Sequence, residues 1–283
     1  MALLNPITIT ITRSDNETKS FSGRPSNSEP FGITSLVGFE FPQVEVFTAA
    51  KGLGDGVFFT GQRLDGRTVE IHLKQNERYP QDHFDGWNNL KSFFNPMMAF
   101  TLEVDNDTSG STVTRYLNDC RILAAEYQFV NASEPNPELI VQMQSSEPCF
   151  TASVSEALTF TDNVDQTFTY SGDAETFVQV ELTVVSGSGG QEAEVTVNGA
   201  LWTVASWYYI SPGDKILLNP EDGTLTRNGQ LIGLAQAPDS DANAIFLNWR
   251  TALGTNANTI KIHPLNTYTL TAKLVYNARY LGI

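Results

Sequence analysis

The sequence predicts a mainly β protein of two domains with one α-helix. Three observations lead to this fold class: strand-like runs recur along the 283 residues, Asp-Gly and Asn-Gly turn signals separate them, and one segment repeats aromatic residues at helical spacing. We expect residues 1–150 to form a β-rich domain of barrel or sandwich type, and residues 151–283 to form an antiparallel β-sandwich or jelly roll.

The N-terminal half begins with an expected strand over residues 7–11, where Ile and Thr alternate. Residues 13–30 are rich in Ser, Asn, Gly and Pro, so a loop or a mobile arm is predicted there. A second strand is expected over residues 32–39. The sequence does not assign a role to the polar segment between these two strands.

The stretch from Gly52 to Leu73 contains two turn signals, Asp55-Gly56 and Asp65-Gly66, each followed by a strand-like run. Glycine in such a turn supplies the positive φ of a tight hairpin, so the stretch is predicted to be a hairpin with one solvated face. Its two faces consist of Val69, Ile71 and Leu73 on one side and Thr68, Glu70 and His72 on the other. The charged groups of this hairpin are expected to be solvated.

A helix is predicted around residues 82–95. Its apolar residues recur at helical spacing, after a capping Asp82 and before Pro96: Phe84, Trp87, Leu90 and Phe94. This stripe is interpreted as a core-facing surface laid on a sheet, in preference to a ligand pocket. Strands are expected to resume over residues 99–104, 121–130 and 139–144.

The domain junction is placed in residues 150–166, which carry Thr, Ser, Ala and Asp but few large apolar residues. Beyond it, alternation over residues 178–184 and 267–276 predicts further strands. Asn198-Gly199 and Asn228-Gly229 are predicted hairpin turns, the second being the strongest such signal in the chain.

The composition excludes several classes of protein. A formal net charge of −15 argues against sequence-specific binding of nucleic acid, because the chain gains little from neutralising phosphates. No apolar run approaches the roughly 20 residues of a membrane span, and the first residues lack the basic and apolar regions of a signal peptide. Two cysteines, Cys120 and Cys149, make no disulfide framework; buried thiols and folding in a cytoplasm are expected, although a Cys120–Cys149 pair stays open.

No motif supports catalysis or a metal. Residues 105–110 open like a calcium loop, but the twelfth position, which needs a bidentate Glu, is Tyr116, so a polar hairpin loop is preferred. The three histidines show no zinc-ligand spacing: His72, His83 and His263. No nucleophile elbow, phosphate loop or dinucleotide fingerprint is present, and paired carboxylates cannot be recognised from sequence alone. We therefore expect no enzyme, no metal and no cofactor.

Aromatic residues gather in the second half of the chain. They are Trp202, Trp207, Tyr208 and Tyr209, with Trp249 further on. Such rings either fill the sandwich core, which is the preferred interpretation, or form a platform for sugar rings. The sugar platform would consist of Trp202, Trp207 and Tyr209.

The order of these elements resembles the distal tail proteins (Dit family) of long-tailed, non-contractile bacteriophages. The resemblance covers roughly residue 30 onward and rests on "DGVFFTGQRLDGRTVEIHL", "ELIVQMQSSEPCF", "NPEDGTLTRNGQLIG", "NAIFLNWRTALGTNANTIKI" and "YNARYLGI". Within these, Arg67 lies in a strand ahead of a helix that stops at Pro96, and Asn228-Gly229 forms a hairpin tip. The polar stretch 13–30 is longer than is usual in the family. There is also no room for the carbohydrate-binding module that some members insert.

The resemblance implies a galectin-like C-terminal half and a structural role in the virion, at the tail tip, after assembly in the host cytoplasm. About six N-terminal halves would form a ring that continues the tail tube, docks on the tube protein and holds the hub or tail-associated protein. The C-terminal halves would attach receptor-binding or side-fibre proteins. The alternatives are a lectin-like carbohydrate-binding module used in adhesion to the host surface and a carbohydrate-active enzyme.

Overall fold

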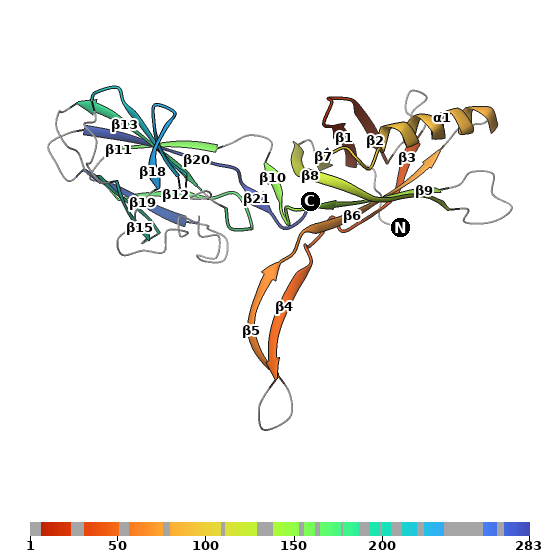
Figure 1. Cartoon of the computed structure of the whole chain (residues 1–283), viewed down its shortest axis with the longest axis horizontal. Helices are drawn as coiled ribbons and strands as arrows, with labels where there is room; N and C mark the ends of the chain where they lie inside the picture. The colour runs from red at the N-terminus through yellow and green to blue at the C-terminus, as the bar shows by residue number, and fades with distance from the viewer. Residues whose placement is uncertain are drawn as a thin grey trace. The chain divides into compact units, whose positions relative to one another are not determined.

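The computed structural model confirms a mainly β fold. It describes residues 7–23, 31–50, 57–75, 80–108, 111–128, 138–152, 156–161, 165–176, 178–186, 193–198, 200–204, 211–219, 224–234, 257–264 and 269–283. These ranges contain 21 strands and one α-helix (Figure 1). The chain divides into unit 1, residues 1–153 together with 280–283, and unit 2, residues 154–279.

Unit 1 is built on a nine-stranded sheet with the order β21-β10-β8-β7-β1-β2-β3-β6-β9. Its strands are β1 (Ile7–Arg13), β2 (Thr18–Ser22), β3 (Phe31–Val37), β6 (Arg67–Gln75), β7 (Phe100–Thr108), β8 (Ser111–Gln128), β9 (Glu138–Ser145), β10 (Phe150–Ala152) and β21 (Arg279–Tyr280).

The sheet of unit 1 closes on itself through the long strand β8. From its start to Cys120, β8 pairs with β7, and from Cys120 onward it pairs with β9, which in turn pairs with β6. Asp119 has a positive φ of 47° where β8 changes partner, a conformation that Asp tolerates better than most residues. The result is a barrel, which agrees with the predicted barrel or sandwich type.

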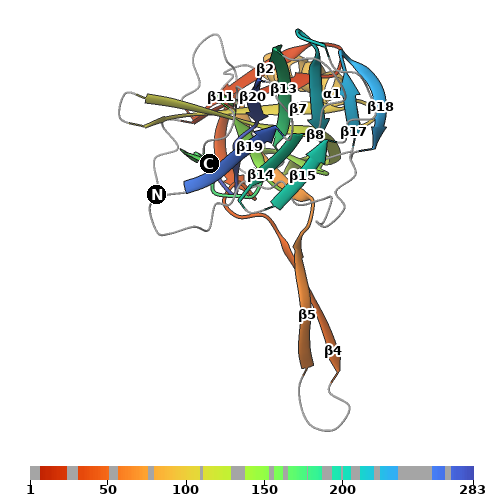
Figure 2. The same cartoon turned by 90° about the vertical axis from the view of Figure 1, so that its left-hand side faces the viewer.

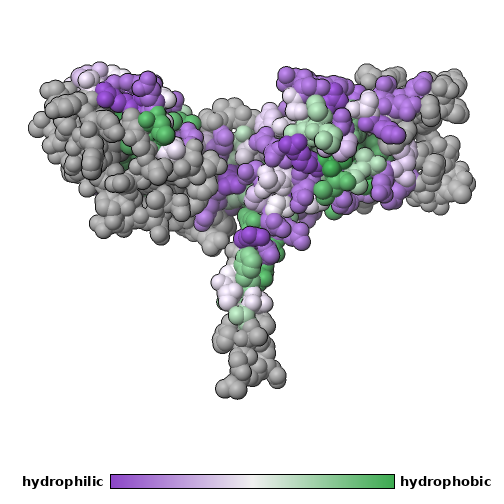
Figure 3. All heavy atoms as spheres, in the orientation of Figure 1, coloured by the Kyte–Doolittle hydropathy of each residue, from purple (hydrophilic) through white to green (hydrophobic). Residues whose placement is uncertain are grey.

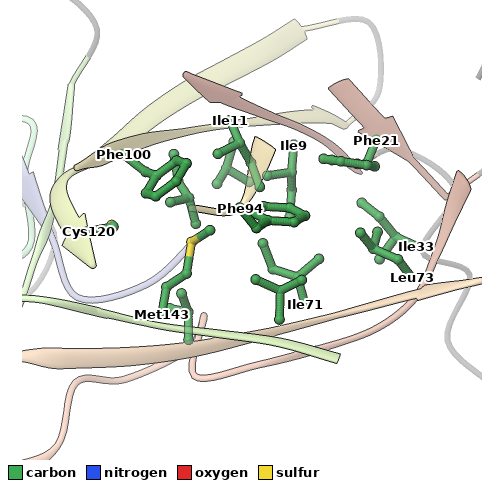
Figure 4. Close-up of a cluster of buried hydrophobic side chains, with 14 of the residues drawn as sticks. Ile9, Ile11, Phe21, Ile33, Ile71, Leu73, Phe94, Phe100, Cys120 and Met143 are labelled. Carbon is green, nitrogen blue, oxygen red and sulfur yellow. The ribbon is translucent and has the colours of Figure 1, made fainter. Parts of the chain in front are cut away.

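The core of unit 1 lies inside this barrel (Figure 4). The predicted alternation of β6 is correct: Val69, Ile71 and Leu73 are fully buried, whereas Thr68, Glu70 and His72 are only partly buried. The predicted helix is α1 (Pro80–Phe93), and Leu90, Phe93 and Phe94 at its end pack into the same core. Phe93 and Phe94 stack edge to face with their ring centroids 5.1 Å apart.

The predicted hairpin around Asp65-Gly66 is wrong. β5 (Val57–Leu64) pairs with β4 (Val44–Ala50), whereas β6 pairs with β3 and β9, so the chain runs through Asp65-Gly66 from one sheet into another. The need for glycine here is steric, because a Cβ on Gly66 would lie 2.6 Å from the carbonyl oxygen of Ser145. Asp65-Gly66 thus forms no turn, and its glycine instead allows a close approach of two backbones.

The predicted loop over residues 13–30 is also partly wrong, because β2 lies within it and pairs with β1. Phe21, the only large apolar residue of this strand, is buried in the core and stacks on Phe94 at 6.4 Å. A single apolar residue, Phe21, in an otherwise polar run is too weak a pattern to predict a strand. Residues 24–30 lie outside the described part of the chain.

Unit 2 consists of two antiparallel sheets, visible as two layers in Figures 1 and 2. The six-stranded sheet contains β11 (Glu156–Thr161), β20 (Thr269–Tyr276), β13 (Gln179–Ser186), β16 (Lys215–Asn219), β17 (Thr224–Arg227) and β18 (Gln230–Leu234). The four-stranded sheet contains β12 (Gln166–Thr169), β19 (Ala257–Pro264), β14 (Ala193–Val197) and β15 (Ala200–Val204). This arrangement agrees with the predicted antiparallel sandwich.

The Asn-Gly signals of unit 2 mark hairpins. Asn228 and Gly229 have φ values of 49° and 80° and join β17 to β18, which is the geometry that two-residue hairpin turns require. Asn198, with φ 49°, lies between β14 and β15. Both hairpins follow from local sequence, which explains why they were predictable.

Candidate assembly interface

The most unusual feature of unit 1 is the hairpin β4–β5, which we call the projecting hairpin. Its two strands pair only with each other among the described strands and form a sheet of their own. Figures 1 and 2 show it extending away from the barrel of unit 1. Residues 51–56, between the two strands, lie outside the described part of the chain.

Strand pairing sets the two faces of the projecting hairpin. Val44 lies opposite Leu64 and Val46 opposite Gln62, so these residues share one face, while Phe47 lies opposite Gly61 on the other. Gly61 leaves room for the ring of Phe47, whose edge would lie 3.9 Å from a Cβ built on the glycine. β-branched and aromatic residues favour an extended strand, which accounts for the local structure.

Apolar side chains on both faces of the projecting hairpin are open to solvent. Phe59 is 79% exposed and Val46 49% exposed, and Val44, Phe47 and Leu64 are exposed as well. Figure 3 shows apolar residues where the hairpin leaves the barrel. Isolated two-stranded hairpins are marginal in water, and contiguous exposed apolar residues mark interaction surfaces. The hairpin therefore has the properties of a strand pair that is covered by another protein surface.

One ion pair accompanies these apolar residues. Nη2 of Arg63 lies 2.7 Å from Oε2 of Glu45, and the Arg63 guanidinium lies 5.5 Å from the ring centroid of Phe47. Both charged side chains are exposed, so the pair contributes little stability, roughly 0–1 kcal/mol. The pair places a charged group of each sign among the exposed apolar residues of the hairpin.

Hydrogen bonds to backbone carbonyl groups join the two strands at the root of the projecting hairpin and link the residues on either side of it. The N–H of Asp65 donates to the carbonyl of Gln43 at 2.9 Å, which joins the two strands at their base. Two residues further on, Arg67 is 1% exposed and donates from Nη1 to the carbonyl of Gly38 at 2.9 Å. The expectation that the charged groups here are solvated is therefore wrong for Arg67.

The sequence analysis expected a strand-like run after Asp55-Gly56, and β5 is that strand, but it predicted neither β4 as its partner nor the exposure of the hairpin. The available signal was that "VEVF" and "VFF" place apolar residues at adjacent positions, hence on both faces of a strand. That pattern is typical of a strand buried on both sides, whereas the described apolar side chains of these strands are exposed. This conflict between sequence pattern and exposure makes the hairpin a candidate interface.

The side chains proposed as a sugar platform lie outside the described part of the chain. Trp202 lies in β15, but its side chain is outside the described part, as are Trp207, Tyr208, Tyr209 and Trp249. The interpretation of these rings as core or as sugar platform therefore stays a prediction.

The described residues hold no cluster of three or more His, Cys, Asp or Glu side chains arranged to bind a metal. Asp105 and Asp107 lie in β7, where Asp105 Oδ1 accepts a hydrogen bond from the Thr114 hydroxyl at 2.5 Å. His72 lies on the partly exposed face of β6 between Glu70 and Glu138, with ring nitrogens 3.7 Å and 3.5 Å from their carboxylates. His83 lies in α1 and His263 in β19.

Cys120 and Cys149 form no disulfide and are buried, as expected for two structural thiols. No helix in the described part of the chain has the length and apolar character needed to cross a membrane.

Comparison with known proteins finds similarity at the level of structure. No family model matches the chain, and no curated protein matches it. The crystal structure of the Dit protein (gp 19.1) of phage SPP1, described as a paradigm of the hub adsorption apparatus in phages infecting Gram-positive bacteria, aligns with a TM-score of 0.67 and 16% identity over 96% of this chain and 99% of that one.

Chains of the phage P2 baseplate align more weakly. In the activated conformation with Ca the TM-score is 0.40 with 9% identity, over 94% of this chain and 97% of that one. With Sr it is 0.38 with 11% identity over the same shares. The strength of the SPP1 match over nearly the whole of both chains leads to one conclusion: this chain has the fold of a phage distal tail protein.

Proposed function

We propose that this chain is a structural component of a bacteriophage tail, in which about six copies form a ring at the distal end of a long, non-contractile tail tube. The observation that carries the proposal is the projecting hairpin, whose exposed apolar side chains would be removed from water by contact with another subunit. The shared fold with a hub protein of SPP1 supports the same kind of role.

A projecting hairpin is compatible with a ring of identical subunits. A hairpin that leaves one copy and lies on a different surface of the next makes a head-to-tail contact, and such contacts close into rings when the rotation per subunit divides a full turn. A ring of about six needs about 60° per subunit. In such a ring, strands at the sheet edges of one subunit can pair with strands of the next, so their backbone N–H and C=O groups are hydrogen-bonded.

The partners in this proposal are the tail tube protein on one side of the ring and the hub or tail-associated protein on the other. Unit 2, proposed to be galectin-like, serves as the attachment platform for receptor-binding or side-fibre proteins. The net charge of −15 suits a channel through which DNA passes, because like charges prevent adhesion. The role includes no catalysis and no cofactor, and its location is the virion tail tip.

The test compares the mass in solution of three proteins: wild type, the double variant Val46→Ser/Phe59→Ser, and the control Val185→Ser/Leu231→Ser. Both pairs replace exposed apolar residues, but the control pair lies in unit 2, where Leu231 is 67% exposed. We expect rings for wild type and control, and monomers for the hairpin variant.

The size of the expected effect follows from the apolar area that the interface buries. Burying each large side chain contributes about 1.5–3 kcal/mol, so losing two per interface weakens association by more than about a hundredfold. Rings of unchanged stability in the hairpin variant would contradict the proposal, because the projecting hairpin would then carry no contact.

A further inference from the structure

Residues Tyr280–Ile283, which we call the return segment, follow unit 2 in the chain but pack in unit 1. Tyr280 and Ile283 lie against the hydrophobic core of unit 1, and the N–H of Ile283 donates to the carbonyl of Phe39 at 3.2 Å. A Cβ on Gly282 would overlap the carbonyl oxygen of Glu40, so only glycine fits there. The return segment is thus held by a backbone hydrogen bond, by apolar packing and by a close approach at Gly282 that excludes any side chain.

Two arginines bind the carbonyl groups of the return segment. Nη2 of Arg67 donates to the carbonyl of Leu281 at 2.5 Å, and Nη1 of Arg115 donates to the carbonyl of Gly282. The Arg115 guanidinium also lies 4.0 Å from the ring centroid of Tyr280, within the range of a cation–π contact. Each type of group in the return segment therefore has a partner in unit 1: the ring of Tyr280 contacts Arg115, the two carbonyl groups accept hydrogen bonds from the arginines, and the N–H of Ile283 donates to Phe39.

Arg67 connects the return segment to two other parts of unit 1. Besides Leu281, it donates to the carbonyl of Pro148 at 2.8 Å and to that of Gly38 at 2.9 Å, while its guanidinium lies 4.6 Å from the ring centroid of Phe150. Gly38, Phe39 and Glu40 lie in the connection between β3 and the projecting hairpin. Arg67 thus contacts both the return segment and the connection that leads into the hairpin.

A cavity of about 150 Å³ adjoins the side chain of Ile283. Val104, Asn106, Val113 and Arg115 line it together with Ile283. Within the described part of the chain, Nε of Arg115 and Oδ1 of Asn106 are buried and make no hydrogen bond. The position after Gly282 thus has room for aliphatic side chains of different shape, whereas the position of Gly282 has none.

We propose that unit 1 contains a peptide-binding site, formed by Arg67, Arg115 and the backbone of residues 38–40, whose ligand is the return segment of the same chain. The ligand class is an extended peptide with an aromatic residue, then one residue, then glycine, then an aliphatic residue. Because residues 154–279 precede the return segment, unit 1 reaches its final packing only after unit 2 has been synthesised.

The return segment also has a consequence for ring assembly. This consequence rests on the proposed function, whereas the peptide-binding site itself does not depend on it. If the projecting hairpin closes the ring, the connection that leads into it is fully packed only in chains that carry the return segment, because Gly282 and Ile283 contact Glu40 and Phe39. Chains interrupted within unit 2 then present a poorly fixed hairpin and stay out of the ring. The site thus makes the packing beside the hairpin depend on prior synthesis of unit 2.

The test uses hydrogen exchange measured by mass spectrometry on the full chain and on a variant that ends after Arg279. Peptides covering β3 and β6 report on unit 1, and peptides covering β13 and β20 report on unit 2. We expect exchange to accelerate at least about tenfold in the unit 1 peptides and to stay unchanged in those of unit 2. Adding a synthetic peptide of residues 277–283 should restore the protection.

Point variants of the full chain distinguish the loss of these specific contacts from a general effect of shortening the chain. Gly282→Val should reproduce the loss of protection in unit 1, because its side chain overlaps Glu40, and Ile283→Leu should not, because the cavity accepts it. Unchanged protection in unit 1 after truncation would overturn the proposal, as would equal losses in both units or a peptide that restores nothing. Exchange is measured within each unit, so these outcomes do not depend on whether a ring forms.

Discussion

Arg67 and Leu281 lie 214 positions apart in the sequence, yet Nη2 of Arg67 donates a 2.5 Å hydrogen bond to the carbonyl of Leu281. The arginine is 1% exposed, and burying a charge is costly unless it is hydrogen-bonded. Carbonyl oxygens from three separate segments accept from it: Gly38, Pro148 and Leu281. This one side chain thus links the connection after β3, the connection between β9 and β10, and the return segment.

Replacing Arg67 by Met should destabilise unit 1. Hydrogen bonds to a charged group contribute about 1.5–3 kcal/mol each, so losing three of them should lower the free energy of unfolding by about 3 kcal/mol or more, allowing for non-additivity. Urea unfolding followed with a probe in unit 1 measures this. Arg121→Met is the control, because Arg121 is exposed and its 3.4 Å ion pair with Asp119 contributes little. Equal effects of the two variants would refute the structural role of Arg67.

Alanine substitution of two glycines that have the same φ should lower the stability of the protein by different amounts. Gly38 and Gly229 both have φ of 80°, so each substitution carries a backbone strain of about 1–2 kcal/mol. A Cβ on Gly38 would also overlap the carbonyl oxygen of Thr68, whereas a Cβ on Gly229 meets nothing within 4 Å. Thermal unfolding should show Gly38→Ala to be at least twice as destabilising. A larger effect of Gly229→Ala would contradict the packing at Gly38.

The thiols of Cys120 and Cys149 should be unreactive in the folded protein. Both are buried, and burial raises the pKa of Cys120 to about 12, so at neutral pH this side chain is the protonated, poorly nucleophilic thiol. Titration with a thiol-reactive disulfide should give no labelling in buffer and two thiols per chain in denaturant. Rapid labelling of either cysteine in buffer would be incompatible with its burial.

Asp214 should make the stability of unit 2 depend on pH in acid. The Ser211 N–H at 2.7 Å, the Asn228 amide at 2.8 Å and Arg227 at 2.5 Å stabilise its carboxylate and hold its pKa below the usual 3.8. A depressed folded-state pKa gives stability that is fully present above the unfolded-state pKa and is lost as the pH falls through the folded-state pKa.

The measurement for Asp214 is the thermal unfolding of unit 2 between pH 7 and about pH 2. Wild type should keep its stability down to about pH 4 and lose it below, while Asp214→Asn should start less stable and show a smaller loss in acid. Identical pH profiles for the two proteins would show that Asp214 contributes nothing through its charge.

Local pattern made several elements predictable from the sequence. Alternation in β6 gave its buried face correctly, because Val69, Ile71 and Leu73 pack on one side of a single sheet. The helix and the Asn228-Gly229 turn followed from spacing and from turn chemistry. Each of these depends on residues close together in the chain.

Long-range packing was not predictable in the same way. Asp65-Gly66 resembles a hairpin turn, but Gly66 is needed because the backbone of Ser145 passes close by. Arg67 appeared to be a solvated strand residue, since its carbonyl partners at residues 38, 148 and 281 are invisible to periodicity. The return of residues 280–283 to unit 1 had no local signal at all.

The measurement that tests the central claim most directly is the solution mass of the purified wild-type chain over a wide range of concentration, combined with electron microscopy of the main species. We predict closed rings of about six subunits, single or stacked in pairs, with the projecting hairpins lying between neighbouring copies. A mass of 31.1 kDa, that of one chain, at every concentration, with no rings in the images, would contradict the account.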